Sequence, residues 1–571
     1  MGTDIGTDRA RAFSASTLCE AFQITSAERA GQLAVRSHDG AVELTHAALG
    51  ERVRALAAGL AGLGVERGDR VALMLTNRPE FHLIDTAAMH LGAVPFSIYN
   101  TSPPAQIAYL LTDAAPRVIV TERLFADAVR AANVPADHLV IVDRDETDGD
   151  GLGVGDRDGA GDGDTVGGGV LDLAGIEATP APEGFDFEAA WRAVRPDDLL
   201  TLIYTSGTTG PPKGVELTHA SMMAEIRGLQ EAMPVTPGGR LISYLPSAHV
   251  ADRWTSHYSG LMTWGMTVTT CPDPKALVGV AAQVHPTFFG GVPRIWEKLK
   301  AALEMLFPAE LEAGDAAAAQ KIKAAIGLDQ AELFVAGAAP TPRDVLDFFA
   351  RIDIPLLEGW GMSETSGFVT IIRPGDPCPG SVGPPLPGME VRLAGDGELL
   401  CRGPVVMRGY RDRPDLTAET VDADGWLHTG DVATIDAAGR VTIVDRKKEM
   451  IISAGGKNMS PANIENAVKA ESPLIAHAVC VGDNRPYNVA LIVLDPETAA
   501  GRDPADPATQ AEIEAAVGRA NAQLSRVEQI KRFAVIADDW APGGEELTPT
   551  MKLKRRPIAA RYEREIEHLY R

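Results

Sequence analysis

The sequence predicts an α/β protein with a large N-terminal body, built of layered sheets and helices in several subdomains, and a small α+β unit at its C-terminal end. The chain has 571 residues, which is more than a single hydrophobic core accommodates. Helical and strand patterns alternate along its first half, as in parallel sheets covered by helices on both faces. After the basic run 445–448, the pattern restarts as a unit of about 125 residues, a size typical of one domain.

In the first half, a predicted helix begins at Thr45, which can cap its first turn, and ends at Gly64. Apolar residues between these two positions recur at helical spacing and form one face for the core. Short apolar runs at 71–75, 118–120 and 139–142 predict strands. Together these elements predict a parallel sheet with helices on both sides.

Residues 143–169 interrupt this pattern. Between Asp143 and Asp164 the chain carries nine acidic residues, two arginines and many glycines. The spacing of Gly and Asp loosely resembles calcium-binding repeats, but no regular nine-residue period is present. We therefore expect a flexible surface insertion within the N-terminal body, which we assign to residues 1–444.

The C-terminal unit, residues 449–571, follows a short hinge at 445–448. Ser460 can cap a helix that has Pro461 at its first position. Two apolar strands and a longer helix follow, at 476–481, 490–494 and 513–527. This order of elements predicts a compact α+β fold.

Composition excludes several classes of protein. With 53 basic and 78 acidic residues, the chain has a formal charge of −25, which opposes binding to nucleic acid and to anionic lipid. The five cysteines are scattered without metal-ligand spacing, so we expect reduced thiols in a cytoplasmic protein. The sequence has no signal peptide and no apolar run of about 18 residues. We expect no nucleic-acid partner, no transmembrane segment and at most peripheral membrane contact; the oligomeric state stays open.

The segment from Tyr204 to Gly214 has the composition of a phosphate-binding loop and follows a strand-like run at 199–203. Glycines let the backbone approach phosphate closely, hydroxyls and amides donate to its oxygens, and a lysine offsets charge. A Walker loop cannot be aligned here, and the alternative is a glycine-rich turn without a ligand. The residues we expect to bind ATP are Thr205, Ser206, Gly207, Thr208, Thr209, Gly210 and Lys213.

This loop resembles the signature motif of the adenylate-forming (AMP-binding) superfamily, which includes acyl-CoA synthetases, firefly-type luciferases and non-ribosomal peptide adenylation domains. Further segments are similar to motifs of that superfamily and stand in the same order: Glu358–Glu364, Trp426–Asp431, Asp445–Lys448 and Thr548–Arg555. The resemblance covers nearly the whole chain outside the acidic insertion. It implies an AMP-forming acid–thiol ligase that uses ATP, Mg²⁺ and coenzyme A, with a mobile C-terminal lid.

By this resemblance, Lys552 is the catalytic lysine. Adenylation brings a carboxylate to the α-phosphate, and a cation between the two anions reduces their repulsion. The family usually has glycine before this lysine, whereas this chain has Met551. Lys554 is therefore a rival, although Arg555 restores the common Lys-x-x-Arg spacing.

The resemblance also assigns the nucleotide and metal residues. Glu364 would hold Mg²⁺ together with phosphate oxygens, and Thr205 would act beside it and Lys552 in catalysis. Trp360 stands where tyrosine is more usual and would stack on adenine, while Asp431 and Arg446 would bind the ribose. The remaining positions expected to contact ATP or AMP are Gly337, Glu358, Gly359, Gly361 and Ser363.

For the second half-reaction, the resemblance implies that the lid rotates about Lys448 and presents a glycine loop to coenzyme A. That loop contains Gly455, Gly456 and Lys457; the alternative is a plain turn before the helix that Ser460 caps. The acyl-adenylate then reacts with the thiol of coenzyme A, so no protein nucleophile is needed.

The acid pocket is expected around His249, Gly291, Gly337 and Ala338, in segments similar to long-chain acyl-CoA synthetases in particular. Small residues leave room for a chain, and each buried methylene contributes about 0.8 kcal/mol. A long-chain fatty acid is therefore the expected substrate. The alternatives are a medium-chain or aromatic acid–CoA ligase, a fatty acyl-AMP ligase, and a nucleotide-binding regulatory protein that has lost catalysis.

Overall fold

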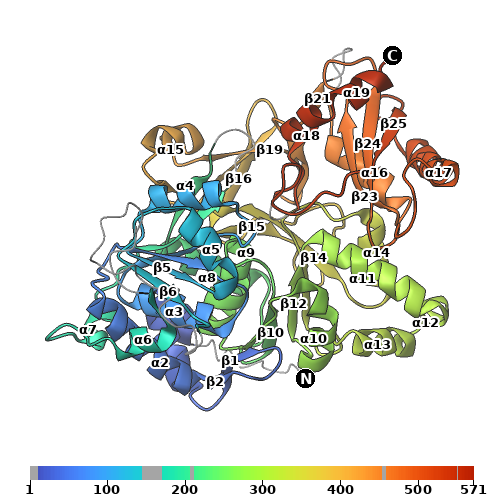
Figure 1. Cartoon of the computed structure of the whole chain (residues 1–571). Helices are drawn as coiled ribbons and strands as arrows, with labels where there is room; N and C mark the ends of the chain where they lie inside the picture. Colours follow the sequence, from blue (N-terminus) through green and yellow to red (C-terminus); the bar gives the residue numbers. More distant parts are fainter. Residues whose placement is uncertain (1–10, 145–169, 206–210, 453–457, 549–550) are drawn as a thin grey trace.

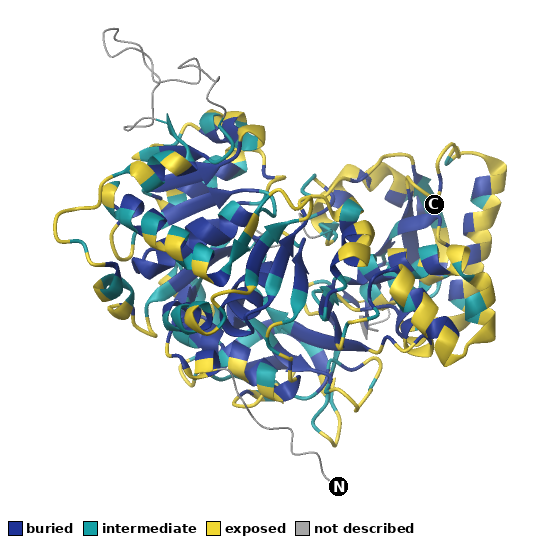
Figure 2. Ribbon diagram, turned by 90° about the horizontal axis from the view of Figure 1, so that it is seen from below, coloured by how far each residue is buried: buried dark blue, intermediate teal, exposed yellow. Residues whose placement is uncertain are grey.

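The computed structural model describes residues 11–144, 170–205, 211–452, 458–548 and 551–571. The predicted acidic insertion lies almost wholly outside these residues. Figure 1 shows a large body that contains the blue-to-yellow elements and a smaller lobe of C-terminal elements, coloured orange and red. Figure 2 shows the same two lobes from below, and each has its own buried interior.

The central sheet of the body has eight strands in the order β18-β9-β8-β4-β3-β5-β6-β7. From β8 to β7 all neighbours run parallel, whereas β9 and β18 form an antiparallel edge. The strands are β3 (Arg70–Met74), β4 (Val94–Ser97), β5 (Val118–Thr121), β6 (His138–Ile141), β7 (Val170–Leu171), β8 (Leu199–Thr205), β9 (Lys213–Thr218) and β18 (Gly409–Tyr410). The parallel sheet predicted for the first half is confirmed.

Three four-stranded sheets complete the body, in the orders β10-β11-β1-β2, β12-β13-β14-β15 and β16-β17-β19-β20. The first contains β1 (Leu33–Ser37), β2 (Glu43–Thr45), β10 (Arg240–Ser243) and β11 (Thr267–Thr270). The second contains β12 (Phe288–Gly291), β13 (Leu333–Ala336), β14 (Leu356–Met362) and β15 (Gly367–Ile371). The third is wholly antiparallel and contains β16 (Glu390–Leu393), β17 (Glu398–Arg402), β19 (Leu427–Ile435) and β20 (Val441–Arg446).

Helices cover these sheets, so the α/β class is confirmed. Those of the body are α1 (Leu18–Glu28), α2 (His46–Gly62), α3 (Pro79–His90), α4 (Pro104–Ala114), α5 (Arg123–Ala131), α6 (Leu173–Ala178), α7 (Phe187–Arg192), α8 (His219–Ala232), α9 (Val250–Asp252), α10 (Leu277–Val284), α11 (Pro293–Leu306), α12 (Pro308–Ala313), α13 (Ala316–Ala325), α14 (Arg343–Arg351) and α15 (Pro414–Thr420). Shorter turns are η1 (Arg11–Ser14), η4 (Pro274–Ala276) and η5 (Ser363–Thr365), and η3 (Arg253–Thr263) is a π-helical segment.

The C-terminal lobe contains the sheet β23-β24-β25, the hairpin β21-β22 and the last four helices. Its elements are β21 (Ile451–Ile452), β22 (Asn458–Met459), α16 (Pro461–Ala470), β23 (Ile475–Val481), β24 (Asn488–Leu494), α17 (Pro507–Gln523), β25 (Ile530–Ile536), α18 (Arg555–Arg561) and α19 (Glu563–Leu569).

Local signals explain where the helices begin. The Thr45 hydroxyl accepts a hydrogen bond from the Ala48 N–H at 3.2 Å and caps α2, and Ser460 caps α16 through the Asn463 N–H at 3.1 Å. Both caps were predicted and are confirmed. The predicted helix at 513–527 was wrong at its end: α17 stops at Gln523, and Val527 lies beyond it with 45% of its surface exposed. An apolar residue in register with a helix face was misread as part of that helix.

The hydrophobic clusters of the described residues fall into separate groups along the chain. The largest cluster draws its buried members from Ala12 to Val441, whereas two others draw theirs only from residues at or after Ile451. The division into a body, a hinge and a lid stays a prediction at this point. Within the described parts of the chain, no helix is both long and apolar enough to cross a bilayer.

Candidate active site

The ends of the predicted phosphate-binding loop lie on the antiparallel pair β8 and β9. Thr205 and Lys213 are directly opposite each other in this ladder. The Tyr109 hydroxyl donates to the Pro212 carbonyl at 3.0 Å, and the Arg411 N–H donates to the Gly214 carbonyl at 2.8 Å. The loop is thus anchored at its second strand. Its intervening residues, 206–210, lie outside the described part of the chain.

Tyr410 connects the lysine of this loop to the predicted metal residue. The Lys213 ammonium lies 4.5 Å from the centre of the Tyr410 ring, and the Tyr410 hydroxyl donates to Glu364 Oε1 at 2.8 Å. Burial, together with the adjacent Glu364 carboxylate, raises the pKa of Tyr410. The sequence analysis missed this residue. Its only signal was an aromatic side chain after Gly409, in a segment without a recognised motif.

Glu364 is buried in the η5 turn, directly after β14 and next to Ser363. Its backbone carbonyl accepts a hydrogen bond from the Met407 N–H at 2.8 Å, which fixes the turn against the segment leading to β18. Among the described residues, no group of three or more His, Cys, Asp or Glu side chains could hold a metal ion. A magnesium ion at Glu364 therefore fits only if phosphate oxygens and water complete its coordination, as is usual for this cation.

Trp360, Asp431 and Arg446 are connected by a hydrogen bond and an ion pair. The Trp360 indole N–H donates to Asp431 Oδ2 at 2.9 Å, and Arg446 Nε lies 2.8 Å from Asp431 Oδ1. Asp431 and Arg446 are opposite each other in the β19–β20 ladder. Burial raises the pKa of Asp431, and the Arg446 charge opposes that shift. The sequence placed these three residues near the nucleotide, and the structure brings them into contact with one another.

Glycines 359 and 361 of β14 are required by packing against β15. A Cβ atom on Gly359 would lie 2.6 Å from the Phe368 ring, and one on Gly361 would lie 1.8 Å from the Gly367 carbonyl oxygen. Glu358 is buried, its Oε1 accepts from the Thr341 N–H at 3.3 Å, and burial raises its pKa. The contacts of these three residues within the protein are therefore structural, and their assignment to ATP stays a prediction.

Lys552 extends from the C-terminal lobe towards this group. It follows a turn in which its N–H donates to the Thr548 hydroxyl at 2.9 Å. Its ammonium interacts electrostatically with Asp431 and Glu364 of the body. Surrounding protein atoms, and then the Arg446 charge, lower the pKa of Lys552, although the residue as a whole keeps exposed surface.

The neighbours of Lys552 in sequence have different roles. Met551 has a φ of +65°, a left-handed backbone that favours glycine. Lys554 donates to the Gly544 carbonyl at 2.7 Å, and Arg555 pairs with Glu449 at 3.1 Å and with Glu465. Both are thus engaged within their own lobe, whereas the charge of Lys552 interacts with carboxylates of the body.

The predicted acid-pocket residues come from three elements of the body. The His249 Nδ1 atom accepts from the Ala251 N–H at 3.1 Å and caps α9. Burial, and to a smaller extent the Lys552 charge, lowers the pKa of His249 to about 4. A Cβ on Gly291 would lie 3.1 Å from the Tyr244 hydroxyl, and one on Gly337 would lie 3.1 Å from the Phe368 ring. Ala338 has a φ of +71°.

The predicted hinge residue Lys448 is exposed in a turn directly after β20. The Glu449 and Met450 N–H groups both donate to the Arg446 carbonyl, at 2.9 and 3.0 Å. Asp445 Oδ2 accepts from the Ala462 N–H at 3.1 Å, which ties the end of β20 to the first turn of α16. The glycine loop residues Gly455, Gly456 and Lys457 lie outside the described residues.

The body and the C-terminal lobe also meet through ion pairs on α11. Arg294 pairs with Asp495, Lys298 with Glu497 at 3.0 Å, and Glu297 with Lys469 at 3.8 Å. Sequence reasoning gave no signal for this seam, because each partner is an ordinary charged residue about 170 to 200 positions away.

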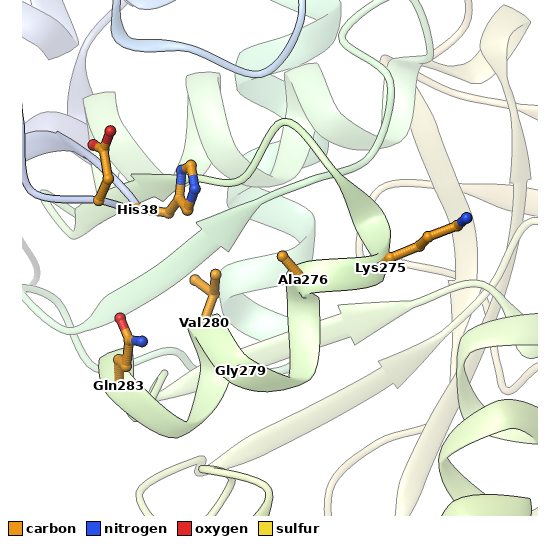
Figure 3. A pocket seen from close by; sticks show the side chains of 7 residues that line it. His38, Lys275, Ala276, Gly279, Val280 and Gln283 are labelled. Carbon is orange, nitrogen blue, oxygen red and sulfur yellow. The ribbon is translucent and has the colours of Figure 1, made fainter.

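Surface hollows elsewhere do not contain the predicted residues. One, of about 570 Å³, lies over α10 and is lined by His38, Asp39, Lys275, Ala276, Gly279, Val280 and Gln283 (Figure 3). Another lies at the first turn of α17 on the C-terminal lobe. Neither is lined by any described residue that we predicted to bind substrate.

Residues 22–411 match the family described as AMP-binding enzyme, and residues 448–571 match the AMP-binding enzyme C-terminal domain. The fatty-acid–CoA ligase fadD11 of Mycobacterium tuberculosis (strain ATCC 25618 / H37Rv) is 46% identical over 70% of this chain and 79% of its own length. The long-chain-fatty-acid–CoA ligase FadD15 of Mycobacterium bovis (strain ATCC BAA-935 / AF2122/97) is 36% identical over 92% of both chains.

Solved structures share the fold at lower identity. The adenylation domain of a carboxylate reductase from Mycobacterium chelonae superposes with a TM-score of 0.78 and 21% identity, over 99% of this chain and 93% of that one. A Mycobacterium tuberculosis fatty acyl CoA synthetase superposes with a TM-score of 0.64 and 23% identity, over 96% and 99% of the two chains. Both place the body and the C-terminal lobe within one common architecture.

Proposed function

The chain belongs to the AMP-binding enzyme family, and on that premise we propose that it activates a fatty acid with ATP and then transfers the acyl group to coenzyme A. In the first step a carboxylate oxygen attacks the α-phosphorus of ATP, the bond to the β-phosphate oxygen breaks, and pyrophosphate leaves. In the second step the thiol sulfur attacks the acyl carbonyl carbon, the thiol proton is lost, and AMP leaves.

One observation carries this proposal: the charge of Lys552, on the C-terminal lobe, interacts with the Asp431 and Glu364 carboxylates, which Trp360 and Tyr410 hold in place by hydrogen bonds. We propose that this cation acts where the α-phosphate and the attacking carboxylate meet, with Asp431 at the ribose and Glu364 at the metal. A lysine ammonium that is in place before the reaction lowers the activation free energy of adenylation, because the surrounding dipoles need not reorganise. The family match and the ligase relatives support the same conclusion.

The roles of the other residues follow from their positions. We propose that Lys213, Thr205 and the loop between them grip the β- and γ-phosphates. Magnesium, held by Glu364 and phosphate oxygens, would offset charge on the leaving pyrophosphate. Asp431 and Arg446 would bind the ribose. His249 would line the acid site as a neutral imidazole, which fits its low pKa.

The chain would work as a body of residues 1–444 and a lid of residues 449–571 that turns about 445–448. The end of one family match at 411 and the start of the next at 448 support this division, as do the hydrophobic clusters that begin at Ile451. The exposed turn at Lys448 can absorb a backbone rotation. Lid rotation would withdraw Lys552 and bring the glycine loop at 455–457 to coenzyme A.

A long-chain fatty acid is the proposed substrate, because two relatives with that name match about nine-tenths of the chain. A side chain at Gly291 would approach Tyr244 and Trp296, and one at Gly337 would approach Phe368. Glycine at both positions leaves this space to a substrate. The five cysteines are free thiols, four of them buried, which supports a reducing cytoplasmic location. Contact with a membrane would be peripheral at most.

The proposal is tested by ATP–pyrophosphate exchange with fatty acids of graded length, aromatic acids and amino acids, each with and without coenzyme A. We expect exchange to peak with long-chain fatty acids and acyl-CoA to appear when coenzyme A is added. Exchange that peaks with aryl or amino acids would overturn the substrate class. Stable acyl-AMP in the presence of coenzyme A would instead indicate a fatty acyl-AMP ligase.

A further inference from the structure

Both carboxylate oxygens of Asp431 are in contact with side chains, one from the body and one from the hinge segment 445–448. Trp360 Nε1 donates to Oδ2 at 2.9 Å from β14, and Arg446 Nε approaches Oδ1 at 2.8 Å from β20. The contact between Trp360 and Asp431 joins two different sheets across 71 positions of sequence. The predicted adenine platform and the predicted ribose acceptor are therefore one connected unit.

The backbone directs Trp360 to this contact. The pairing of β14 with β15 shifts register between Trp360 and Gly361, and such bulges re-aim side chains next to functional sites. Only 9% of the Trp360 surface and 3% of the Asp431 surface are exposed. The donor is a property of the indole ring: phenylalanine has none, and tyrosine carries its hydroxyl at the far end of the ring.

Such partners help a carboxylate to bind the hydroxyls of a ribose selectively. The terminal torsion of aspartate is broad, so an unrestrained carboxylate would have to be ordered when the ribose binds. Each oxygen can accept more than one hydrogen bond. With the indole N–H on one oxygen and the Arg446 charge beside the other, the carboxylate plane is restrained, and an acceptor position remains on each oxygen for a pair of vicinal hydroxyls.

We propose that Trp360 is a positioning residue for ribose recognition, which orients Asp431 through its indole N–H in addition to stacking on adenine. This inference rests on the proposed function, because it requires the nucleotide to bind at Asp431. The competing explanation is that the hydrogen bond merely satisfies a buried indole. The two differ in what they predict for nucleotides that lack a ribose hydroxyl.

The test is calorimetric binding of AMP, 2′-deoxy-AMP and 3′-deoxy-AMP to the full-length protein and to Trp360→Phe, which keeps an aromatic face and removes the donor. We expect AMP to bind about tenfold more weakly to the variant, the order of a charged hydrogen bond. The affinity for each deoxy nucleotide should fall about threefold or less. The ratio of AMP affinity to deoxy-AMP affinity should therefore be smaller in the variant than in the wild type. Equal weakening of all three nucleotides, or no weakening, would overturn the inference.

Trp264→Phe is the matched control. The Trp264 indole N–H donates to Gln230 Oε1 at 2.9 Å, the ring is fully buried in the same body, and Gln230 is not among the residues predicted to bind the nucleotide. This variant also loses an indole hydrogen bond, yet its ratio of AMP to deoxy-AMP affinity should equal that of the wild type. An equal fall in discrimination would assign the Trp360 effect to general loosening of the body.

A double-mutant cycle isolates the contact. In an Asp431→Ala background, Trp360→Phe should change discrimination between AMP and its deoxy forms by less than twofold; an unreduced effect would refute action through Asp431. These measurements need neither acid nor coenzyme A. If AMP binds and no fatty acid is activated, the proposed substrate fails and this inference stands. If AMP does not bind, both fail.

Discussion

The body and the C-terminal lobe contribute to the candidate site in different ways. On the body, Asp431 and Glu364 are buried, and each accepts a hydrogen bond from a side chain of another strand. On the lobe, Lys552 is exposed, and its charge is attracted by Asp431 and Glu364 but repelled by Arg446. The carboxylates of the body are thus held by contacts within the body. Under the proposed function, the lid would add a charge that lid rotation can remove again.

The largest test of this comparison is Lys552→Ala. We expect acyl-AMP formation to fall by about 10²- to 10³-fold, since one charged donor to the transition state is lost, while nucleotide binding to the body changes little. Thiolysis of supplied acyl-AMP by coenzyme A should remain largely intact. Equal loss of both half-reactions, measured separately, would contradict a lysine that serves only the first.

The pH dependence of the first half-reaction should reflect the same lysine. The pKa of Lys552 is lowered from its ordinary value of 10.5, so the cation is lost, and pyrophosphate exchange falls, at a lower pH than for a free lysine. Beyond that pKa the charged fraction drops about tenfold for each pH unit. Lys552→Arg keeps its charge to higher pH and should move this alkaline limb upward. An unmoved limb would assign it to another group.

The seam on α11 offers a smaller perturbation. Arg294→Met removes the pair with Asp495 while keeping the length of the side chain. The lid should then spend less time against the body. A partly exposed ion pair contributes roughly 1 kcal/mol, so acyl-AMP formation should fall about three- to fivefold. Thiolysis should not fall with it.

The control for this seam lies on the same helix. Lys300 pairs with Asp344 at 2.7 Å, and both residues belong to the body. Lys300→Met therefore removes a similar ion pair without touching the lid, and acyl-AMP formation should stay near wild type. If both variants slow the reaction alike, α11 acts through its own stability and not through the lid.

The smallest expected effect concerns Met551. Because its φ is +65°, glycine should be tolerated better than alanine there, by about 1 kcal/mol of unfolding free energy. Met305 is an exposed helical position on α11. There the alanine variant should be more stable than the glycine variant, by about 1 kcal/mol of unfolding free energy. Denaturant unfolding of the four variants provides both comparisons. If the alanine variant has the higher free energy of unfolding at both positions, the backbone at Met551 is not strained.

Much of the fold could be predicted from local signals. Thr45 and Ser460 cap helices because their hydroxyls satisfy backbone N–H groups next to them in sequence. The apolar runs became strands of a parallel sheet, since such strands are buried on both faces. Val527 was misread because periodicity alone cannot tell a continuing helix from an apolar residue that follows it.

The sequence by itself determined the family, the chemistry and the identity of the charged residues, because motifs with fixed internal spacing record what each short segment must do. Only the tertiary structure decided how those segments meet. The contacts of Trp360 with Asp431, of Tyr410 with Glu364 and of Arg294 with Asp495 join residues 71, 46 and 201 positions apart. Partners at such distances are chosen by how sheets and lobes pack, and no local pattern encodes them.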